Sequence, residues 1–359
     1  MKIINTHATC GLLHDGRVES ESSTLLLRAR VMSVAHRLGF SETDCQNMGL
    51  VATELASNLY KYAEGRGSVQ VWQQPGGVLD IFALDYGPGI ADVTAALDDG
   101  YSTSGTLGKG LGSIHRLSNE MMVYSRRHDD SPVRKWTGTA ILARFRTDET
   151  VDDWTAPAQV GLYSRALTDA RFNGDIVYLQ RTNHALRWLH LDALGHGQEA
   201  QETIDSLGNH LHADAAPEQM LHDADCQLVE SRGAVGIAGE LRFTENRFAL
   251  VGVGDMHAHV LRAPRDQTDT LFFAPGVLGR EHKHPTEYLE PFDRRGLIVT
   301  ASDGIRRNWD GDSFPGLQEQ HPQLIAYVLG NIMGRMSDDQ SICAVALPSE
   351  STTTRPRPS

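Results

Sequence analysis

Three short motifs in the first third of the chain occur in an order that limits what this part can fold into: ELASN (54–58), DYGPGI (85–90) and GTLGKGLGS (105–113). The first places Glu54 and Asn58 four residues apart, so that on a helix both side chains lie on one face. The second sets Asp85 before Gly87 and Gly89, where the chain can turn tightly beside a ligand. The third is a glycine-rich loop that can turn backbone N–H groups onto phosphates. Together they predict a nucleotide site.

The commoner glycine-rich nucleotide motifs do not fit this loop. A P-loop requires G-x-x-x-x-G-K-[ST], but Lys109 is followed by Gly110 and no glycine stands at position 103. The dinucleotide fingerprint G-x-G-x-x-G directly after a strand is also missing. The three ordered motifs resemble instead the GHKL-type ATPases, and GYSTSGTLGKGLGSIHRL (100–117) is similar to the RsbT group of switch-protein serine kinases.

This resemblance covers about residues 20–146 and implies a role for each motif. Glu54 would take the proton from the incoming serine hydroxyl, and Asn58 would hold Mg²⁺ through its amide oxygen. Asp85 would accept a hydrogen bond from the adenine amino group of ATP, beside a backbone kept close to the base by two glycines, Gly87 and Gly89. The phosphates would be bound by one short segment: Gly108, Lys109, Gly110, Leu111 and Gly112.

Local patterns predict an α+β fold for both halves. Before residue 147 we expect a short strand at 1–6, two helices over 22–40 and 41–63, and then strands near 68–73, 78–84, 121–126 and 136–146. Ser41 with Asp44 forms the N-cap box of the second helix. After residue 157, strands outnumber helices, and the helices fall near three segments: 197–212, 217–229 and 319–333.

The second half carries aspartates at the borders of apolar strands, in LDALGHG (191–197), TASDGI (300–305) and SDDQS (337–341), with a further Gly-Asp at 174–175. Strand ends are places where a site can form. Converging carboxylates without thiols suit Mg²⁺ or Mn²⁺ better than zinc. Two such ions can share a hydroxide for in-line attack on a phosphoester. The histidine pairs at 257/259 and 282/284 are interpreted as solvated or core residues rather than ligands, and His196 as an outer neighbour of the site.

Residues 158–348 resemble the metal-dependent PPM-type phosphatases, in particular the SpoIIE/RsbX branch, which implies an α/β/β/α sandwich. Asp192 would be the bridging ligand and, together with Asp303, a catalytic residue, with the carbonyl of Ala193 as a backbone ligand. The other expected metal ligands match the family by position: Asp175, Asp303, Asp338 and, less directly, its neighbour Asp339. Two positions depart from the family pattern, because Ala193 replaces a glycine and Asp255 replaces an asparagine.

Length, charge and cysteine content indicate the number of domains, the class of partner and the cellular compartment. A chain of 359 residues is long enough for two domains. We expect a GHKL-type domain at 1–146, an acidic linker at 147–157, a phosphatase domain at 158–348 and a disordered tail at 349–359. Most of the net charge of −13 lies after residue 150, which argues against nucleic acid or an anionic membrane as partner. Four scattered cysteines, no signal peptide and no long apolar stretch indicate a cytoplasmic protein.

The sequence therefore predicts a bifunctional regulator that uses ATP, Mg²⁺ and two Mn²⁺ or Mg²⁺ ions. It would phosphorylate and dephosphorylate a serine or threonine of a STAS-domain switch protein, as the two resemblances imply, and the kinase half would also bind or release a further signalling protein. Two alternatives stay open. The first half can be a module that binds ATP and sequesters a partner, or a nucleotide sensor for a phosphatase that is the only active enzyme. A histidine kinase is disfavoured, since no phosphoacceptor helix is recognisable.

Overall fold

The computed structural model describes residues 4–7, 10–18, 20–97, 110–127, 136–147, 158–167, 172–209, 215–262 and 267–347. These residues form two compact units. One unit contains the described part of residues 11–147, and the other contains residues 4–10 together with the described part of 158–347. The second boundary between the units falls inside the expected linker at 147–157, most of which lies outside the described residues.

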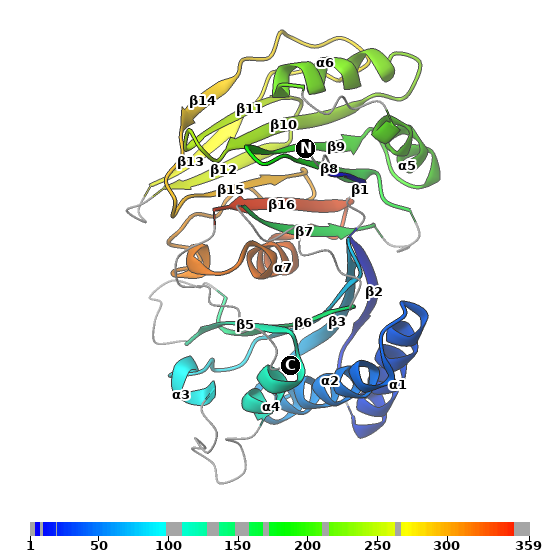
Figure 1. Cartoon of the computed structure of the whole chain (residues 1–359), viewed down its shortest axis with the longest axis vertical. Coiled ribbons are helices and arrows are strands. Elements are labelled where there is room, and N and C mark those ends of the chain that lie inside the picture. Colours follow the sequence, from blue (N-terminus) through cyan, green and yellow to red (C-terminus); the bar gives the residue numbers. More distant parts are fainter. Residues whose placement is uncertain are drawn as a thin grey trace. The chain divides into compact units, whose positions relative to one another are not determined.

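The 11–147 unit is an antiparallel sheet with helices on one face (Figure 1). Its strand order is β2 (Gly11–Gly16), β3 (Gly67–Gln74), β4 (Val78–Asp85), β6 (Gly138–Arg146) and β5 (Glu120–Arg126). The helices of this unit are α1 (Glu21–Arg37), α2 (Glu42–Ala63), α3 (Val93–Leu97) and α4 (Gly110–Leu117). Two long helices and several strands confirm the α+β sandwich expected for this half.

The alternation of side chains in the strands builds the core of this unit. Val69 and Val71 of β3 and Ile81 of β4 point to the helical side and pack in one cluster with Leu55 of α2. Helix α2 begins where the sequence predicts, because Ser41 Oγ accepts a hydrogen bond from the backbone N–H three residues later at 3.1 Å. One face of α2 therefore packs on the sheet, and residues on its other faces are available to form a binding site.

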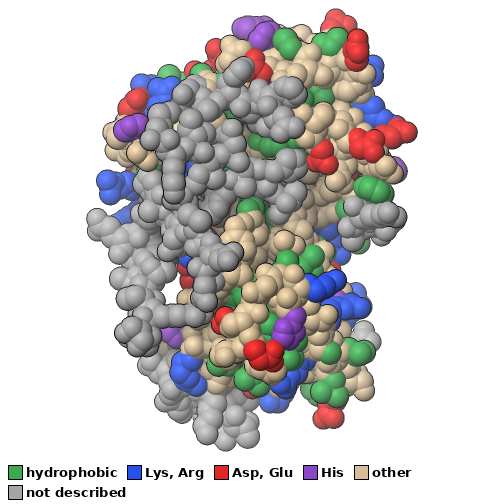
Figure 2. Space-filling model, turned by 45° about the vertical axis from the view of Figure 1, so that its right-hand side comes forward, with side chains coloured by type: hydrophobic (Ala, Val, Ile, Leu, Met, Phe, Trp, Pro, Cys, Tyr) green, Lys and Arg blue, Asp and Glu red, His purple; other side chains and the backbone are tan. Residues whose placement is uncertain are grey.

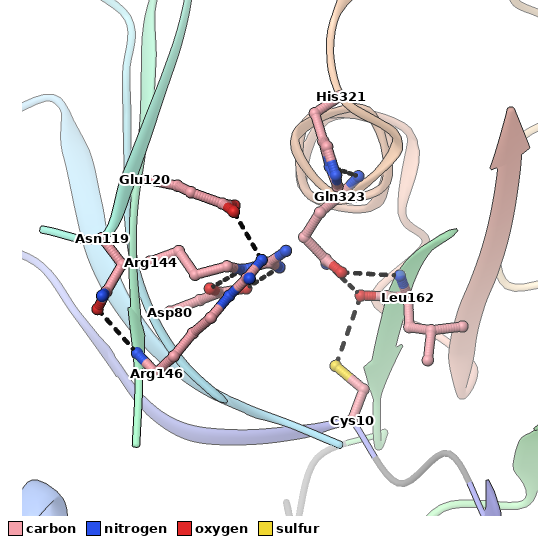
Figure 3. A network of polar contacts seen from close by, with 9 residues as sticks. All are labelled: Cys10, Asp80, Asn119, Glu120, Arg144, Arg146, Leu162, His321 and Gln323. Carbon is pink, nitrogen blue, oxygen red and sulfur yellow. Dashed lines mark hydrogen bonds and ion pairs between the residues drawn. The ribbon is translucent and has the colours of Figure 1, made fainter. Parts of the chain in front are cut away.

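Two arginines of β6 form ion pairs on the sheet (Figure 3). Arg144 donates two hydrogen bonds of 2.8 Å to the two carboxylate oxygens of Asp80. Arg146 pairs with Glu120 at 2.6 Å, and its backbone N–H donates to Asn119 Oδ1 at 3.0 Å. Because the first pair is bidentate, it fixes the register of β6 against β4 more strictly than a single contact would.

The other unit contains two sheets. The six-stranded sheet has the order β1 (Ile4–His7), β8 (Asp175–Arg181), β9 (Ala185–Ala193), β10 (Ala234–Arg242), β11 (Arg247–Val253) and β14 (Tyr288–Pro291). The five-stranded sheet has the order β13 (Gln267–Phe272), β12 (His257–Arg262), β15 (Leu297–Ala301), β16 (Gln340–Ala346) and β7 (Gln159–Arg165). Every strand pair in both sheets is antiparallel.

Helices cover the outer faces of these two sheets (Figure 1). The six-stranded sheet is covered by α5 (Gln198–Asp205), which continues as the 3₁₀ helix η2 (Ser206–Asn209), and by α6 (Pro217–Gln227). The five-stranded sheet is covered by α7 (Pro322–Met333), which follows the 3₁₀ helix η3 (Leu317–Glu319). The result is the α/β/β/α sandwich that the sequence predicts.

Strand β9 shows how the sandwich separates an apolar face from a polar one. Leu189, Leu191 and Ala193 belong to the cluster that packs against α5 and α6. Because side chains alternate along a strand, His190 and Asp192 lie on the opposite face, which is turned toward the second sheet. Polar side chains on this inner face need partners there.

A glutamine attaches α7 to the neighbouring strand β7 (Figure 3). The side-chain amide of Gln323 accepts from the backbone N–H of Leu162 at 3.1 Å and donates to its carbonyl at 2.6 Å. These are the two hydrogen bonds that a neighbouring strand would make. Cys10 Sγ also donates a hydrogen bond to this carbonyl at 3.5 Å, so Cys10 contacts strand β7.

The N-terminal strand corrects the expected domain order. The sequence assigns residues 1–146 to one domain, but β1 pairs with β8 of the sandwich, from Ile4 opposite Arg181 to His7 opposite Tyr178. The 11–147 unit is thus inserted between the first strand of the sandwich and the rest of it. Strand pairing over such a sequence distance leaves no local signal, because the sequence pattern of a short strand is the same whichever sheet the strand joins.

Deleting residues 1–7 should therefore destabilise the 158–347 sandwich and spare the 11–147 unit. A few lost hydrogen bonds at about 1 kcal/mol each correspond to a fall in Tm of roughly 5–10 °C for a unit of this size. Calorimetry of the full chain, with each transition assigned by adding ATP or Mn²⁺, measures the two units separately. A fall in the ATP-sensitive transition alone would contradict the placement of β1.

Surface charge, helix hydropathy and cysteine state can be compared with the composition of the chain. The face in Figure 2 carries Asp and Glu side chains interspersed with Lys and Arg, so charge of both signs is mixed there. Within the described ranges, no helix has the length and apolar content needed to cross a membrane. The four cysteines are free thiols, of which Cys10, Cys45 and Cys343 are buried and Cys226 is exposed.

Candidate functional site

The first site lies where α2 meets the start of α4. Glu54 and Asn58 are half-buried and one turn apart on α2. A Cβ built on Gly110, the first residue of α4, would lie 3.4 Å from Glu54 Oε2 and 3.7 Å from Asn58 Oδ1. A larger residue would therefore fill the space in front of both side chains. The free N–H groups of the α4 N-terminus lie beside them, as an anion site requires.

Asp85 ends β4 with one oxygen fixed by the backbone. Its Oδ1 accepts from the N–H of Gly87 at 2.8 Å and from the N–H of Thr139 at 3.0 Å. Burial raises the pKa of the Asp85 carboxyl, while these two hydrogen bonds act in the opposite direction. No described residue hydrogen-bonds the second oxygen, Oδ2, so a ligand can use it as an acceptor.

Two glycines near Asp85 allow close approaches of the backbone, Gly89 to Arg126 and Gly138 to Asp85. Gly89 has φ +77°, and a Cβ there would lie 2.3 Å from the carbonyl oxygen of Arg126. Gly138 has φ +147°, and a Cβ there would lie 2.1 Å from the carbonyl oxygen of Asp85. Both positions thus require glycine on steric and conformational grounds. The sequence motif identifies the first, whereas Gly138 lies outside any motif.

The phosphate-binding segment is described only in part. Gly110, Leu111 and Gly112 form the first turn of α4, with both glycines buried. Gly108 and Lys109 lie outside the described residues, so their expected roles stay predictions.

The second site lies where β8 begins and β9 ends. Asp175 stands directly opposite Asp192 in the register of these strands, so both carboxylates share the inner face of the six-stranded sheet. The backbone N–H of Ala193 donates to the carbonyl of Gly174 at 2.9 Å and continues the ladder past the two aspartates. Two like charges in directly opposed positions repel each other unless a cation or a proton separates them.

Asp303 and Asp338 reach the same region from two loops of the five-stranded sheet. Asp303 follows β15 and Asp338 precedes β16. The loops are joined by the bridge between Ile305 and Gly334 and by the hydrogen bond from Arg335 N–H to the Gly304 carbonyl, at 2.8 Å. The two carboxylates are therefore held in one place by backbone contacts.

Asp339 has a different environment from its neighbour. Its Oδ1 accepts from the backbone N–H of Leu167 at 2.6 Å, and its Oδ2 accepts from that of Gly174 at 2.8 Å. The side chain is nearly fully buried. Asp339 thus holds the turn that precedes Asp175, whereas the half-buried Asp338 has the more accessible carboxylate.

The electrostatics of this site favour cations. Burial raises the pKa of Asp192 well above its ordinary range, and nearby carboxylates raise it further: Asp175, Asp303, Asp338 and Asp255. Burial and the same kind of repulsion raise the pKa of Asp303, against which Arg335 and Arg307 act weakly. Asp175 Oδ1 is buried without a hydrogen-bond partner. As the described side chains stand, no three His, Cys, Asp or Glu residues are arranged to hold an ion by themselves. The donor set, all oxygen, fits Mg²⁺ or Mn²⁺.

Asp175 should make the metal-free sandwich less stable as the pH rises. Burial is the main cause that raises its pKa from 3.8 to about 7, so the folded state favours the protonated carboxyl. The stabilisation is therefore complete below pH 4 and lost as the pH rises through about 7. In thermal melts with EDTA, Asp175→Asn should raise Tm over the wild type at pH 8 and change it little at pH 4. An equal effect at both pH values would contradict this.

Sequence reasoning missed several polar residues beside these aspartates. Ser341 Oγ donates to Asp175 Oδ2 at 2.7 Å, and the Ser302 hydroxyl also bonds this carboxylate. His190 is fully buried and bonds Ser341, with burial lowering the pKa of the ring to about 3. The serines belong to the SDDQS and TASDGI motifs, which were interpreted for their aspartates alone.

His196 is exposed, and the buried His257 and His259 lie in the protein core as predicted.

The comparisons with known proteins concern both halves. Residues 19–140 match a family model described as a histidine kinase-like ATPase domain. The serine/threonine-protein kinase RsbT of Bacillus subtilis (strain 168) is 36% identical over 125 residues, which are 33% of this chain and 93% of that kinase. A chain from a bacterial stressosome study is 20% identical with a TM-score of 0.48, and the match covers 52% of this chain and 98% of that one. RsbX in complex with magnesium is 16% identical with a TM-score of 0.46, covering 53% and 96%.

Proposed function

Because the chain belongs to the family of the serine/threonine-protein kinase RsbT, we propose that its 11–147 unit transfers phosphate from ATP to a protein serine or threonine. The observation that supports this most directly is the position of Gly110 against Glu54 and Asn58. An acid, an amide oxygen and a helix N-terminus then meet in one place, and phosphoryl transfer needs such positioning and charge neutralisation more than covalent chemistry.

Each side chain of this site has a separate task in the proposal. Glu54 accepts the proton of the attacking hydroxyl, and Asn58 supplies an amide oxygen to Mg²⁺. Asp85 accepts a hydrogen bond from the adenine amino group through the oxygen that the backbone leaves free. The first turn of α4 binds phosphate oxygens with its backbone N–H groups.

We further propose that the 158–347 sandwich is a metal-dependent protein serine/threonine phosphatase. Two Mg²⁺ or Mn²⁺ ions would supply a hydroxide and neutralise the phosphoester charge. The ligands would be the carboxylates of Asp175, Asp192, Asp303 and Asp338 and the carbonyl of Ala193. Asp339 would support the site without binding a metal ion directly, because both its oxygens already accept hydrogen bonds from backbone N–H groups.

The two activities would share one substrate, a STAS-domain switch protein with a phosphorylatable serine or threonine. Linkage in one chain fixes the opposed enzymes at a one-to-one ratio. The level of phosphorylation then depends on their relative rates rather than on their relative amounts.

A steady-state experiment tests the shared substrate. With ATP, Mg²⁺ and a candidate STAS-domain protein, the wild type should keep producing ADP and phosphate while the phosphorylated fraction stays intermediate by mass spectrometry. Asp303→Asn should drive this fraction close to one. An unchanged fraction would show that the halves act on different proteins. Tight ATP binding without ADP formation would favour instead a nucleotide-sensing or sequestering role for the 11–147 unit.

A further inference from the structure

A buried line of hydrogen bonds crosses the sandwich next to the acidic site. His190 of β9 lies 2.7 Å from Ser341 Oγ of β16 through Nε2 and 3.0 Å from Thr300 Oγ1 of β15 through Nδ1. Ser341 Oγ in turn lies 2.7 Å from Asp175 Oδ2 of β8. All four side chains are at most 5% exposed. The histidine therefore connects the six-stranded sheet to the five-stranded sheet at the site.

The direction of these bonds follows from the chemistry of the groups. When a bound cation keeps Asp175 ionised, the carboxylate can only accept, so Ser341 gives its single hydroxyl hydrogen to it. The Ser341 oxygen is then an acceptor, and His190 must donate through Nε2–H. A neutral imidazole has one N–H, so its Nδ1 is an acceptor for the hydroxyl hydrogen of Thr300, whose other acceptor, the Cys343 carbonyl, lies farther away at 3.5 Å. The line thus runs in one direction, from Thr300 to Asp175.

This line fixes one oxygen of Asp175 and leaves the other for a ligand. Oδ2 is held by Ser341, whereas Oδ1 is buried and has no hydrogen-bond partner. The Ser302 hydroxyl supports the same carboxylate, and Ser302 Oγ accepts from the backbone N–H of Ser341 at 3.0 Å. Partners of this kind orient the carboxylates that bind metals, and their loss typically costs roughly 10–100-fold in metal affinity.

We propose that His190 is a positioning residue of the metal centre: it holds Ser341, and through Ser341 it holds Asp175, in the orientation that presents Oδ1 to a divalent cation. The inference rests on the proposed phosphatase function of the sandwich. It adds an outer set of residues, of which Thr300, Ser302 and Ser341 lie within the aspartate motifs and His190 directly precedes one.

Calorimetric titration of MnCl₂ into the full chain, without nucleotide, tests this role. Ser341→Ala and His190→Phe each remove the support of Asp175 and should weaken Mn²⁺ binding roughly 10–100-fold. His190→Gln retains an N–H donor of similar reach and should restore part of the affinity. The matched control is His259→Phe, because His259 is an equally buried strand histidine whose Nε2 lies 3.1 Å from the Arg307 carbonyl and whose ring stacks on Trp309.

The outcomes separate positioning from mere stability. We expect the two His→Phe variants to lower the metal-free Tm by comparable amounts, while only the variant at 190 loses Mn²⁺ affinity. Wild-type Mn²⁺ affinity in a folded Ser341→Ala variant would overturn the inference and leave the phosphatase proposal intact. This variant also decides the matter if His190→Phe does not fold. A wild type that binds neither Mn²⁺ nor Mg²⁺ would overturn both.

Discussion

Replacing Asp192 by asparagine is expected to reduce the hydrolysis of p-nitrophenyl phosphate at least about 100-fold. Asp192 lies at the centre of the acidic site, opposite Asp175 in the strand register and within reach of the charges on both loop aspartates. An asparagine keeps the size of the side chain and removes one negative charge from the ligand set. Metal ions contribute several kcal/mol of charge stabilisation in such reactions, and each 1.4 kcal/mol is a factor of ten in rate.

The control for this substitution is Asp293→Asn, which makes the same chemical change in an exposed turn of the same unit. It should retain wild-type hydrolysis. EDTA should reduce the wild type to the level of Asp192→Asn, and Mn²⁺ should restore only the wild type. Hydrolysis that persists in EDTA would contradict the two-metal proposal.

The sequence predicted the 11–147 unit well because its site comes from neighbouring segments. Ser41 caps α2 as expected, and the Glu54–Asn58 spacing places both side chains on one face of that helix. Glycine at position 89 marks a positive φ that the motif implies. Such features are local, and local rules of capping, periodicity and turn chemistry are sufficient to predict them.

Other features depend on contacts that no local pattern encodes. β1 joins a sheet whose next strand begins at Asp175, and the edge strands β2, β13 and β14 were not predicted, since edge strands carry weak periodicity. The line from Thr300 to Asp175 passes between two sheets, and its members come from four strands. A buried histidine in a strand reads as an ordinary core residue until its partners are known.

The two sites therefore differ in how much of the fold they need. The kinase-type site is built on α2, the end of β4 and α4, so local packing of one unit is enough to form it. The acidic site collects carboxylates from β8, β9 and two loops of the other sheet, and it exists only when both sheets are in place. Damage to β1 or to the line at His190 should thus impair the proposed phosphatase site and spare the proposed kinase site.

Glu54→Gln is expected to lower phosphate transfer to the partner protein by roughly 10²–10⁴-fold, the usual contribution of a positioned general base. Glutamine has the same shape and can still form hydrogen bonds next to Gly110, but it cannot accept the hydroxyl proton. Affinity for ATP should stay within about threefold of the wild type, because the proposed adenine contact at Asp85 and the α4 N-terminus are untouched. Calorimetry measures this affinity, and mass spectrometry of the partner measures transfer.

The matched control is Glu42→Gln, which makes the same change in the exposed first turn of the same helix. It should leave both transfer and ATP affinity unchanged, since its carboxylate contacts only the start of α2 and His36. Combining Glu54→Gln with Asp303→Asn removes the possibility that the phosphate is transferred and then hydrolysed by the other unit. If the partner stays unphosphorylated in the double variant, no phosphate has been transferred to it. If the double variant instead accumulates phosphorylated partner at the rate of Asp303→Asn alone, Glu54 is not the base, and the geometry around Gly110 serves only to bind the nucleotide.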